Sequence, residues 1–265
     1  MTKPFKADVL VVKLSGKALT ADKALDALFA ALAGSAASAE RTRVVLVHGG
    51  GVEVDALMRG LGRRIDRIEV SPAEDMPVIA GALAGTCSLK LRGAAQRAGL
   101  MPLGLCATDA GIGRVVPADP RLGRVGVIEP GDSAAKRCLQ ALLDAGFTPV
   151  ISSVGMDAAG ALWNINADDA AVASAALLGA PLIFLSDVPG VLDANKHLFE
   201  QLNEEQAETL IAEGVISGGM TVKVRAAFRA AAMTGKPVAA ASVFDPMLPN
   251  KLASGQLPGT TFTLE

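Results

Sequence analysis

The stretch Arg43-Val-Val-Leu-Val-His-Gly-Gly-Gly51 contains the pattern that decides the fold. Its β-branched run is typical of a buried strand in a parallel sheet. The glycines predict a tight turn into a helix, whose apolar face starts with Val54, Leu57 and Met58. A strand that passes through a glycine turn into a helix indicates a layered arrangement of strands and helices.

A second copy of this pattern precedes the first. Asp8-Val-Leu-Val-Val-Lys-Leu14 is another apolar run, and it ends in Ser15-Gly16. Between the two runs, apolar residues recur at helical spacing from Leu25 to Leu32. Strand, helix, strand and helix in this order predict the α/β class, with helices packed on a mostly parallel sheet.

Helices and strands continue to alternate along the rest of the chain. Ser71-Pro-Ala-Glu74 has the spacing of a capping box and predicts a helix that runs to about Ala98. The other predicted elements are an antiparallel excursion over residues 63–70, strands over 101–106, 124–128, 148–153, 181–187 and 237–242, and helices around 139–143, 168–178, 203–213 and 218–233. A boundary is expected near residues 170–175, inside a helix, so that two lobes share one continuous sheet.

Composition and charge exclude several classes of function. The 25 Lys+Arg against 27 Asp+Glu give a formal charge of −2, without the basic surplus of nucleic-acid-binding proteins. Aromatic residues are 3% of the chain and Tyr is absent, so no stacking surface for bases is expected.

No apolar run reaches the ~18–20 residues that span a bilayer, and the start of the sequence lacks the apolar core of a signal peptide. Three widely spaced cysteines argue against a disulfide framework or a zinc site. We expect a soluble, cytoplasmic protein that binds neither nucleic acid nor membranes.

Two lysines are candidates for binding an anion. Lys13 lies near the end of an apolar strand. Burying a charge there is costly unless the lysine binds an anion or forms an ion pair. Lys223 lies in a helix that opens with the pair Gly218-Gly219. The alternatives are a solvated lysine at a strand end for Lys13 and an ordinary exposed helical lysine for Lys223.

Two carboxylates and one histidine occupy similar junctions. Asp168 follows a strand at the start of a helix, where it either faces a ligand or compensates the helix dipole. Asp187 ends a buried strand, either as a turn residue or as a ligand-facing carboxylate. His48 has no Ser, Cys or metal-ligand partner at useful spacing, which favours a hydrogen-bonded structural role.

These residues share a position at the carboxyl ends of predicted strands, where open α/β sheets bind ligands. The glycine turn alone is ambiguous, because a strand-to-helix turn can use glycine only for its backbone conformation. Two lysines together with N–H groups at helix N-termini suit an anion. Since Walker and dinucleotide loop patterns are absent from the sequence, we expect an anion-binding site of another kind.

With these motifs in this order, the chain resembles the amino acid kinase family over nearly its whole length. The motifs are Lys13-Leu-Ser-Gly16, Val47-His-Gly-Gly-Gly51, Gly81-Ala-Leu-Ala-Gly-Thr86, Leu162-Trp-Asn-Ile-Asn-Ala-Asp168, Leu185-Ser-Asp-Val-Pro-Gly-Val-Leu-Asp193 and Gly218-Gly-Met-Thr-Val-Lys223. Several of them are most similar to the members that phosphorylate N-acetylglutamate in arginine biosynthesis.

The resemblance implies a three-layer αβα sandwich with a central, mostly parallel sheet. Residues 1–172 would form the lobe for the acyl substrate and for dimerisation, and residues 173–265 the ATP-binding lobe. The short stretch before the first strand leaves no room for the extra helix of arginine-sensitive hexameric members, so a homodimer insensitive to arginine is expected.

The resemblance also assigns roles to individual residues. Lys13 would stabilise the transferring phosphoryl oxygens, Lys223 would neutralise the leaving ADP, and Asp168 would orient both lysines. Gly50 and Gly51 would donate backbone N–H groups to substrate or γ-phosphate, and Asn164 would hold acetylglutamate. The residues expected to border the nucleotide are Ser15, Gly16, Asp187, Val188, Pro189, Gly190, Val191, Leu192, Val215, Ile216 and Ser217.

The implied chemistry agrees with the residue types. A γ-carboxylate has a pKa of about 4.3, so it is an ionised nucleophile at neutral pH and needs no general base. The cofactor would be ATP with Mg²⁺ carried by the nucleotide, and no metal site of the protein's own is expected.

The sequence departs from the family pattern at Glu69, and again at Ser88-Leu89, where the family has Asn-Lys. Where the family has an arginine that grips the substrate's carboxylate, this chain has Glu69, and Arg64 or Arg67 would have to replace that arginine. Two alternatives therefore stay open. One is a kinase for another carboxylate, such as an aminoadipate derivative or a carrier-linked glutamate, and the other is a non-catalytic nucleotide-binding relative.

Overall fold

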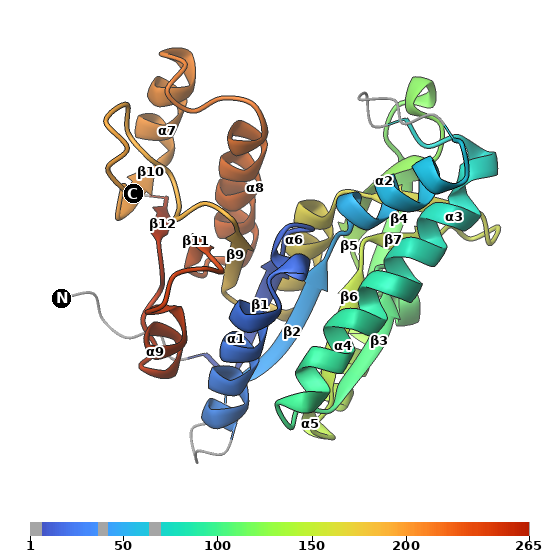
Figure 1. Cartoon of the computed structure of the whole chain (residues 1–265), viewed down its shortest axis with the longest axis horizontal. Coiled ribbons are helices and arrows are strands. Elements are labelled where there is room, and N and C mark those ends of the chain that lie inside the picture. Colours follow the sequence, from blue (N-terminus) through green and yellow to red (C-terminus); the bar gives the residue numbers. More distant parts are fainter. Residues whose placement is uncertain (1–6, 37–41, 64–69, 265) are drawn as a thin grey trace.

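An eight-stranded sheet runs through the middle of the molecule, with helices on both of its faces (Figure 1). The computed structural model describes residues 7–36, 42–63 and 70–264. In spatial order the strands are β10 (Gln201–Asn203), β12 (Thr260–Thr263), β11 (Val238–Ser242), β9 (Leu182–Ser186), β1 (Val9–Leu14), β2 (Arg43–His48), β6 (Thr148–Ser152) and β3 (Pro102–Cys106). Neighbouring strands are parallel except β11 and β12, which are antiparallel.

The helices form two layers because alternate residues of each strand face opposite sides of the sheet. Val11 and Phe184 pack with one layer of helices, and Val12 and Ile183 pack with the other. The first layer contains α5 (Ser133–Asp144), α6 (Ala167–Leu178), α7 (Glu204–Ala212) and α8 (Gly219–Thr234), and the second contains α1 (Asp22–Ala36), α4 (Ser88–Arg97) and α9 (Leu248–Ala253). This confirms the predicted αβα sandwich.

The sheet is continuous between the two parts of the chain. β9 pairs with β1, and Leu185 lies opposite Leu14. The expected boundary at residue 172 falls inside α6, so any relative movement of the two parts has to bend this sheet or this helix. The division into two lobes with separate roles stays a prediction.

A second, four-stranded sheet was not predicted from the sequence. Its spatial order is β4 (Gly113–Pro117), β5 (Val125–Pro130), β8 (Leu162–Ile165) and β7 (Val154–Met156). These strands are short. The segments paired in β5–β8 and β7–β8 show little alternation of apolar and polar residues. Their pairing depends on tertiary contacts, which single-sequence patterns do not show.

The predicted capping box at Ser71–Glu74 does not form. Ser71 pairs in a β-bridge with Gly123, and its hydroxyl accepts a hydrogen bond from Asn164. Pro72 instead begins a 3-10 turn at Ala73–Asp75 that has no side-chain cap. The long helix predicted behind it exists in three sections, α3 (Met76–Ala80), a π-helical segment (Gly81–Cys87) and α4.

The departure at Glu69, the substitutes Arg64 and Arg67 and most of the antiparallel excursion predicted over 63–70 lie outside the described residues.

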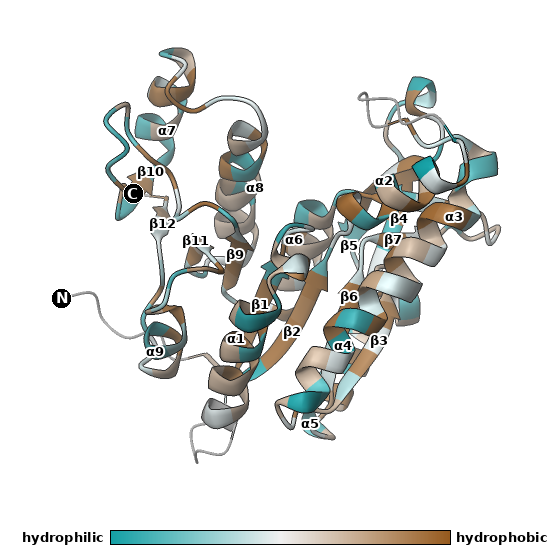
Figure 2. Cartoon of the chain, in the orientation of Figure 1, coloured by the Kyte–Doolittle hydropathy of each residue, from teal (hydrophilic) through white to brown (hydrophobic). Residues whose placement is uncertain are grey.

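Apolar side chains are concentrated in the interior strands, and hydrophilic ones on the outer faces of helices such as α4 (Figure 2). None of the helices in the described ranges combines the length and apolarity that crossing a membrane requires.

Strand β12 holds the loop that follows β9. The buried hydroxyl of Thr260 accepts a hydrogen bond of 2.9 Å from the backbone N–H of Val191. Gly190 passes so close to this hydroxyl that a Cβ on Gly190 would lie 2.5 Å from it. Strand β12, which lies about 70 residues further along the chain, therefore holds the loop of residues 187–192 in place.

Replacing Thr260 with valine is expected to destabilise the fold, because it leaves the buried N–H of Val191 without an acceptor. The free energy of unfolding should fall by about 1–3 kcal/mol. Urea unfolding measures this change, and Thr261→Val on the same strand, where the side chain is half-buried, serves as the control. Equal stability of the two variants would contradict the inference.

Candidate active site

A buried ion pair joins β1 to the start of α6. Lys13 Nζ lies 2.6 Å from Asp168 Oδ1, and the two side chains are only 10% and 12% exposed. The Asn166 side chain caps α6 by accepting a hydrogen bond of 2.8 Å from the backbone N–H of Asp168. Lys13 is therefore not a solvated strand-end lysine, and Asp168 does more than compensate a helix dipole.

Lys223 lies in the second turn of α8 and reaches the end of β9. Its Nζ donates a hydrogen bond of 3.0 Å to Ser186 Oγ. Burial lowers the pKa of Lys223, and the positive charge of Lys13 lowers it further, while Asp168 and Asp187 oppose that shift. Lys223 is thus electrostatically coupled to the Lys13–Asp168 pair, which an ordinary exposed helical lysine would not be.

A third lysine that the sequence analysis missed lies at the same edge of the sheet. Lys17 Nζ is 2.8 Å from Asp187 Oδ2, and the side chains are 69% and 37% exposed. The hydrogen bond from Lys17 lowers the pKa of Asp187 below its ordinary value. The signal for Lys17 was its place directly after Ser15-Gly16, but a lysine in a turn is too common to single out.

The two glycine turns lie against each other above the sheet. A Cβ on Gly16 would lie 3.3 Å from the backbone nitrogen of Gly51, at the start of α2 (Gly51–Gly60). Gly50 has a φ of −178°, an extended conformation that any residue adopts. Glycine is required there by space, because a Cβ would lie 2.4 Å from Cys87 Sγ and 3.0 Å from Leu83 Cδ2.

His48 is fully buried at the end of β2, with Nδ1 2.9 Å from the carbonyl oxygen of Gly49. Burial lowers the pKa of its imidazole. A neutral, hydrogen-bonded histidine has a structural role here.

A cavity of about 500 Å³ adjoins the glycine turn. Gly50, Gly51 and Asn164 all line it, so the three residues expected to bind the acyl substrate come together. Asn164 Nδ2 donates a hydrogen bond of 3.0 Å to Ser71 Oγ, which fixes the amide at the cavity wall. The buried carboxylate of Asp75, another lining residue, forms an ion pair with Arg63.

The residues expected at the nucleotide follow β9 and precede α8. Ser15 donates its backbone N–H to Leu185 O at 3.0 Å, which places Ser15-Gly16 beside the carboxyl end of β9. Val191 and Ile216, one from each predicted segment, are buried in the same apolar cluster. Asp187 and Ser217 are exposed, so each segment combines a buried anchor with an exposed polar residue.

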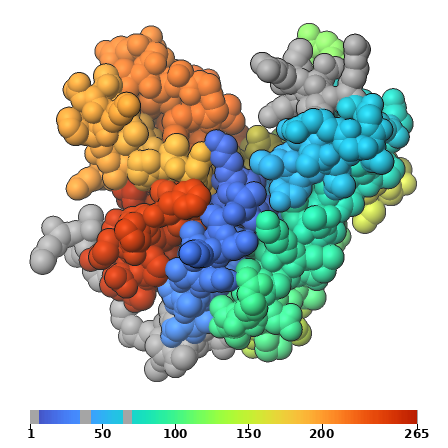
Figure 3. Space-filling view, in the orientation of Figure 1, coloured from blue at the N-terminus to red at the C-terminus, as the bar shows by residue number. Residues whose placement is uncertain are grey.

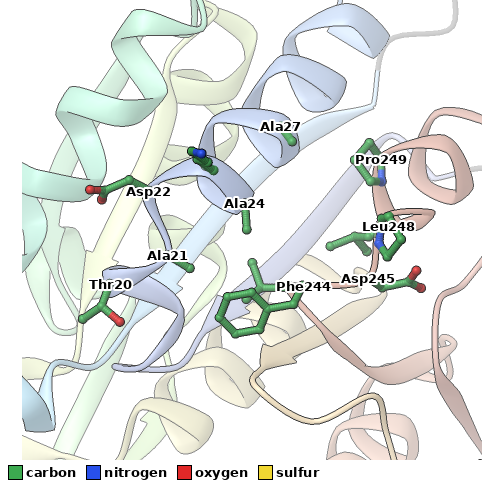
Figure 4. A pocket seen from close by; sticks show the side chains of 12 residues that line it. Thr20, Ala21, Asp22, Ala24, Ala27, Phe244, Asp245, Leu248 and Pro249 are labelled. Atoms are coloured by element: carbon green, nitrogen blue, oxygen red, sulfur yellow. The ribbon is translucent and has the colours of Figure 1, made fainter.

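The surface is hollowed between α2 and the pair α7 and α8, above the loop that follows β1 (Figure 3). A separate and slightly larger cavity, of about 560 Å³, lies between the start of α1 and the segment that leads into α9 (Figure 4). None of the residues predicted for the active site lines this second cavity. Within the part of the chain that the structure describes, no group of three or more His, Cys, Asp or Glu side chains could hold a metal ion.

Three lysines, two aspartates and two glycine turns lie together at one edge of the sheet, a combination that suits the binding of an anion. The chain belongs to the amino acid kinase family. The family model matches residues 8–241. The acetylglutamate kinase of Vibrio vulnificus is 46% identical over 265 residues, covering 99% of both chains. That of Aeromonas salmonicida is 46% identical over 258 residues, covering 96% of this chain and 98% of the relative.

Solved structures show the same fold. A Streptococcus mutans protein has a TM-score of 0.79 at 25% identity, covering 97% of this chain and 99% of that one. The N-acetylglutamate synthase of Neisseria gonorrhoeae has a TM-score of 0.81 at 22% identity, covering 97% of this chain and 60% of the synthase. Carbamate kinase from Giardia has a TM-score of 0.70 at 17% identity, covering 98% of this chain and 99% of that one.

Single substitutions of Lys13 and Asp168 are expected to shift the pKa of Lys223 in opposite directions. Lys13→Met removes a neighbouring positive charge and should raise that pKa, whereas Asp168→Asn removes a negative charge and should lower it. NMR titration of ¹³C-methylated lysines measures both shifts. Shifts of the same sign would show that the three charges are not coupled in this way.

Gly50→Ala is expected to displace the glycine turn, and Cys87→Ala should relieve the clash because it removes the Sγ atom. The single variant Gly50→Ala should raise the KM for the acyl substrate about tenfold or more. The double variant should return to within about threefold of the Cys87→Ala control, because the Sγ atom that the new methyl group would strike is gone. A tenfold change in KM corresponds to about 1.4 kcal/mol. Failure of the second substitution to rescue the first would mean that Gly50 is needed for a reason other than space.

Proposed function

We propose that this chain transfers the γ-phosphoryl group of ATP to the γ-carboxylate of N-acetyl-L-glutamate, giving N-acetylglutamyl 5-phosphate and ADP in arginine biosynthesis. The observation that carries the proposal is its 46% identity to an acetylglutamate kinase over 99% of both chains. The lysine cluster beside the cavity at Gly50, Gly51 and Asn164 supplies the chemistry.

Transfer needs positioning and charge neutralisation rather than proton abstraction. The γ-carboxylate is already ionised, so one of its oxygens attacks the γ-phosphorus while the bond to the β-phosphate oxygen breaks and ADP leaves with that electron pair. The chief barrier is the approach of an anion to a polyanion. Cations and N–H donors fixed in place before the reaction lower that barrier without reorganising.

Each residue of the cluster has a role in this scheme. Lys13 stabilises the oxygens of the transferring group, and its position is fixed by Asp168. Lys223 neutralises the charge that develops on the leaving β-phosphate, and Ser186 holds its ammonium group at the end of β9. The backbone N–H groups of Gly50 and Gly51, at the start of α2, face the approaching oxygens with the positive end of the helix dipole.

The acyl substrate occupies the 500 Å³ cavity in this proposal. Asn164 holds acetylglutamate, and the ion pair with Arg63 neutralises the carboxylate of Asp75 at the cavity wall. The nucleotide lies along residues 187–192 and 215–217 together with Ser15-Gly16. Mg²⁺ arrives with ATP and neutralises part of the phosphate charge.

The same proposal assigns residues 1–172 to the acyl substrate and to dimerisation and residues 173–265 to ATP. It takes the active form to be a homodimer in the cytoplasm. The family resemblance of the motifs supports these assignments.

Trapping the acyl phosphate with hydroxylamine tests the activity. With acetylglutamate and MgATP the protein should form the hydroxamate, and Lys13→Met should lower kcat by about 10²–10³ because it removes a charge that acts in the transition state. Lys251→Met, far along the sequence at an ion pair with Asp245, is the control. Hydroxamate formed only from an aminoadipate derivative would identify another acceptor, and none from any carboxylate would favour a non-catalytic nucleotide-binding protein.

A further inference from the structure

Lys17 and Asp187 meet where β1 and β9 end. Lys17 lies in the turn that leaves β1, immediately before the 3-10 turn Ala18–Thr20, and Asp187 directly follows β9. Because these strands are parallel neighbours, both residues project from the edge of the sheet that carries Lys13 and Ser186. The contact of 2.8 Å is made between residues 170 positions apart in the sequence.

This ion pair differs from the Lys13–Asp168 pair in its exposure. The side chains of Lys13 and Asp168 are 10% and 12% exposed, and those of Lys17 and Asp187 are 69% and 37% exposed. A buried pair cannot lose one partner without leaving an uncompensated charge, whereas an exposed pair is weakly held and screened by water. Lys17 is therefore free to exchange its carboxylate partner for another anion.

The charges around Lys17 favour such an exchange. Three lysines (Lys13, Lys17 and Lys223) face two carboxylates (Asp168 and Asp187), which leaves one net positive charge at this edge. The other four groups each shift the pKa of Lys223. A triphosphate that enters this cluster brings more negative charge than the two carboxylates supply.

The position of the turn before Lys17 indicates which part of the nucleotide Lys17 would contact. Gly16 lies against Gly51, at the N-terminus of α2 and beside the cavity of the acyl substrate. The next residue, Lys17, is thus close to the place where the two substrates meet, and the terminal phosphate is the part of the nucleotide that has to reach this place.

We propose that Lys17 binds the γ-phosphate of the nucleotide, leaving Asp187 when ATP enters and returning to it when ADP remains. This inference rests on the proposed function for the identity of the nucleotide. It adds to Lys13 and Lys223 a third cation, which distinguishes the triphosphate from the diphosphate.

Calorimetric titration with Mg²⁺ and either AMP-PNP or ADP tests the proposal without turnover. Lys17→Met should weaken the binding of AMP-PNP about tenfold and that of ADP less than twofold. Lys17→Arg should keep most of the affinity for AMP-PNP, because it retains the charge. Lys23→Met, an exposed lysine on α1, is the matched control and should change neither affinity.

Steady-state kinetics provide a second test of the role of Lys17. In Lys17→Met the KM for ATP should rise while the KM for the acyl substrate stays within about twofold of the original. Unchanged binding of AMP-PNP, or an equal loss for AMP-PNP and ADP, would overturn the assignment to the γ-phosphate. If acetylglutamate proves not to be the acceptor, the two titrations still decide the role of Lys17, since neither contains an acyl substrate.

Discussion

The arrangement of the proposed site depends above all on the buried ion pair between Lys13 and Asp168. Removing two charges from water is expensive, and their mutual attraction repays this cost only when the geometry is close. In this protein the two charges lie at the centre of the sheet. Lys13 is on β1, the strand that pairs with β9 and so joins both halves of the chain, and Asp168 is on α6, which contains the expected boundary. Replacing a buried ion pair with apolar residues of similar size is often neutral for folding, and the proposed function gives these two charges their reason.

The other two lysines near this pair are more exposed to solvent than Lys13, and they differ from each other in exposure. Lys223 is half-buried and held by a serine hydroxyl, and Lys17 is largely exposed and held by a carboxylate. In the proposed function, this difference in exposure would meet two separate requirements of phosphoryl transfer. Groups that act in the transition state have to be rigid before the substrate arrives, whereas groups that capture and release a nucleotide have to change partners.

Sequence patterns predicted the features that depend on local composition. The apolar runs at residues 8–14 and 43–47 gave their strands because each is buried on both faces of the sheet. The predicted capping box failed because the Ser71 hydroxyl is used by Asn164, 93 residues further along the chain. Lys17 was missed for a similar reason, since its partner Asp187 lies 170 positions further along the chain. Pairings of this kind become visible only when the chain is folded.

The hydrogen bond between Thr260 and Val191 has a consequence for the synthesis of the chain. The acceptor is made 69 residues after the donor. While a ribosome is still adding those residues, the loop after β9 has no permanent partner for its N–H group, and β12 is missing from its place between β10 and β11. A chain that lacks β12 would keep most of the core, because both apolar layers draw largely on earlier residues, but its loop of residues 187–192 would lack this hydrogen bond. The loop after β9 therefore gains this hydrogen bond only after the residues of β12 have been added.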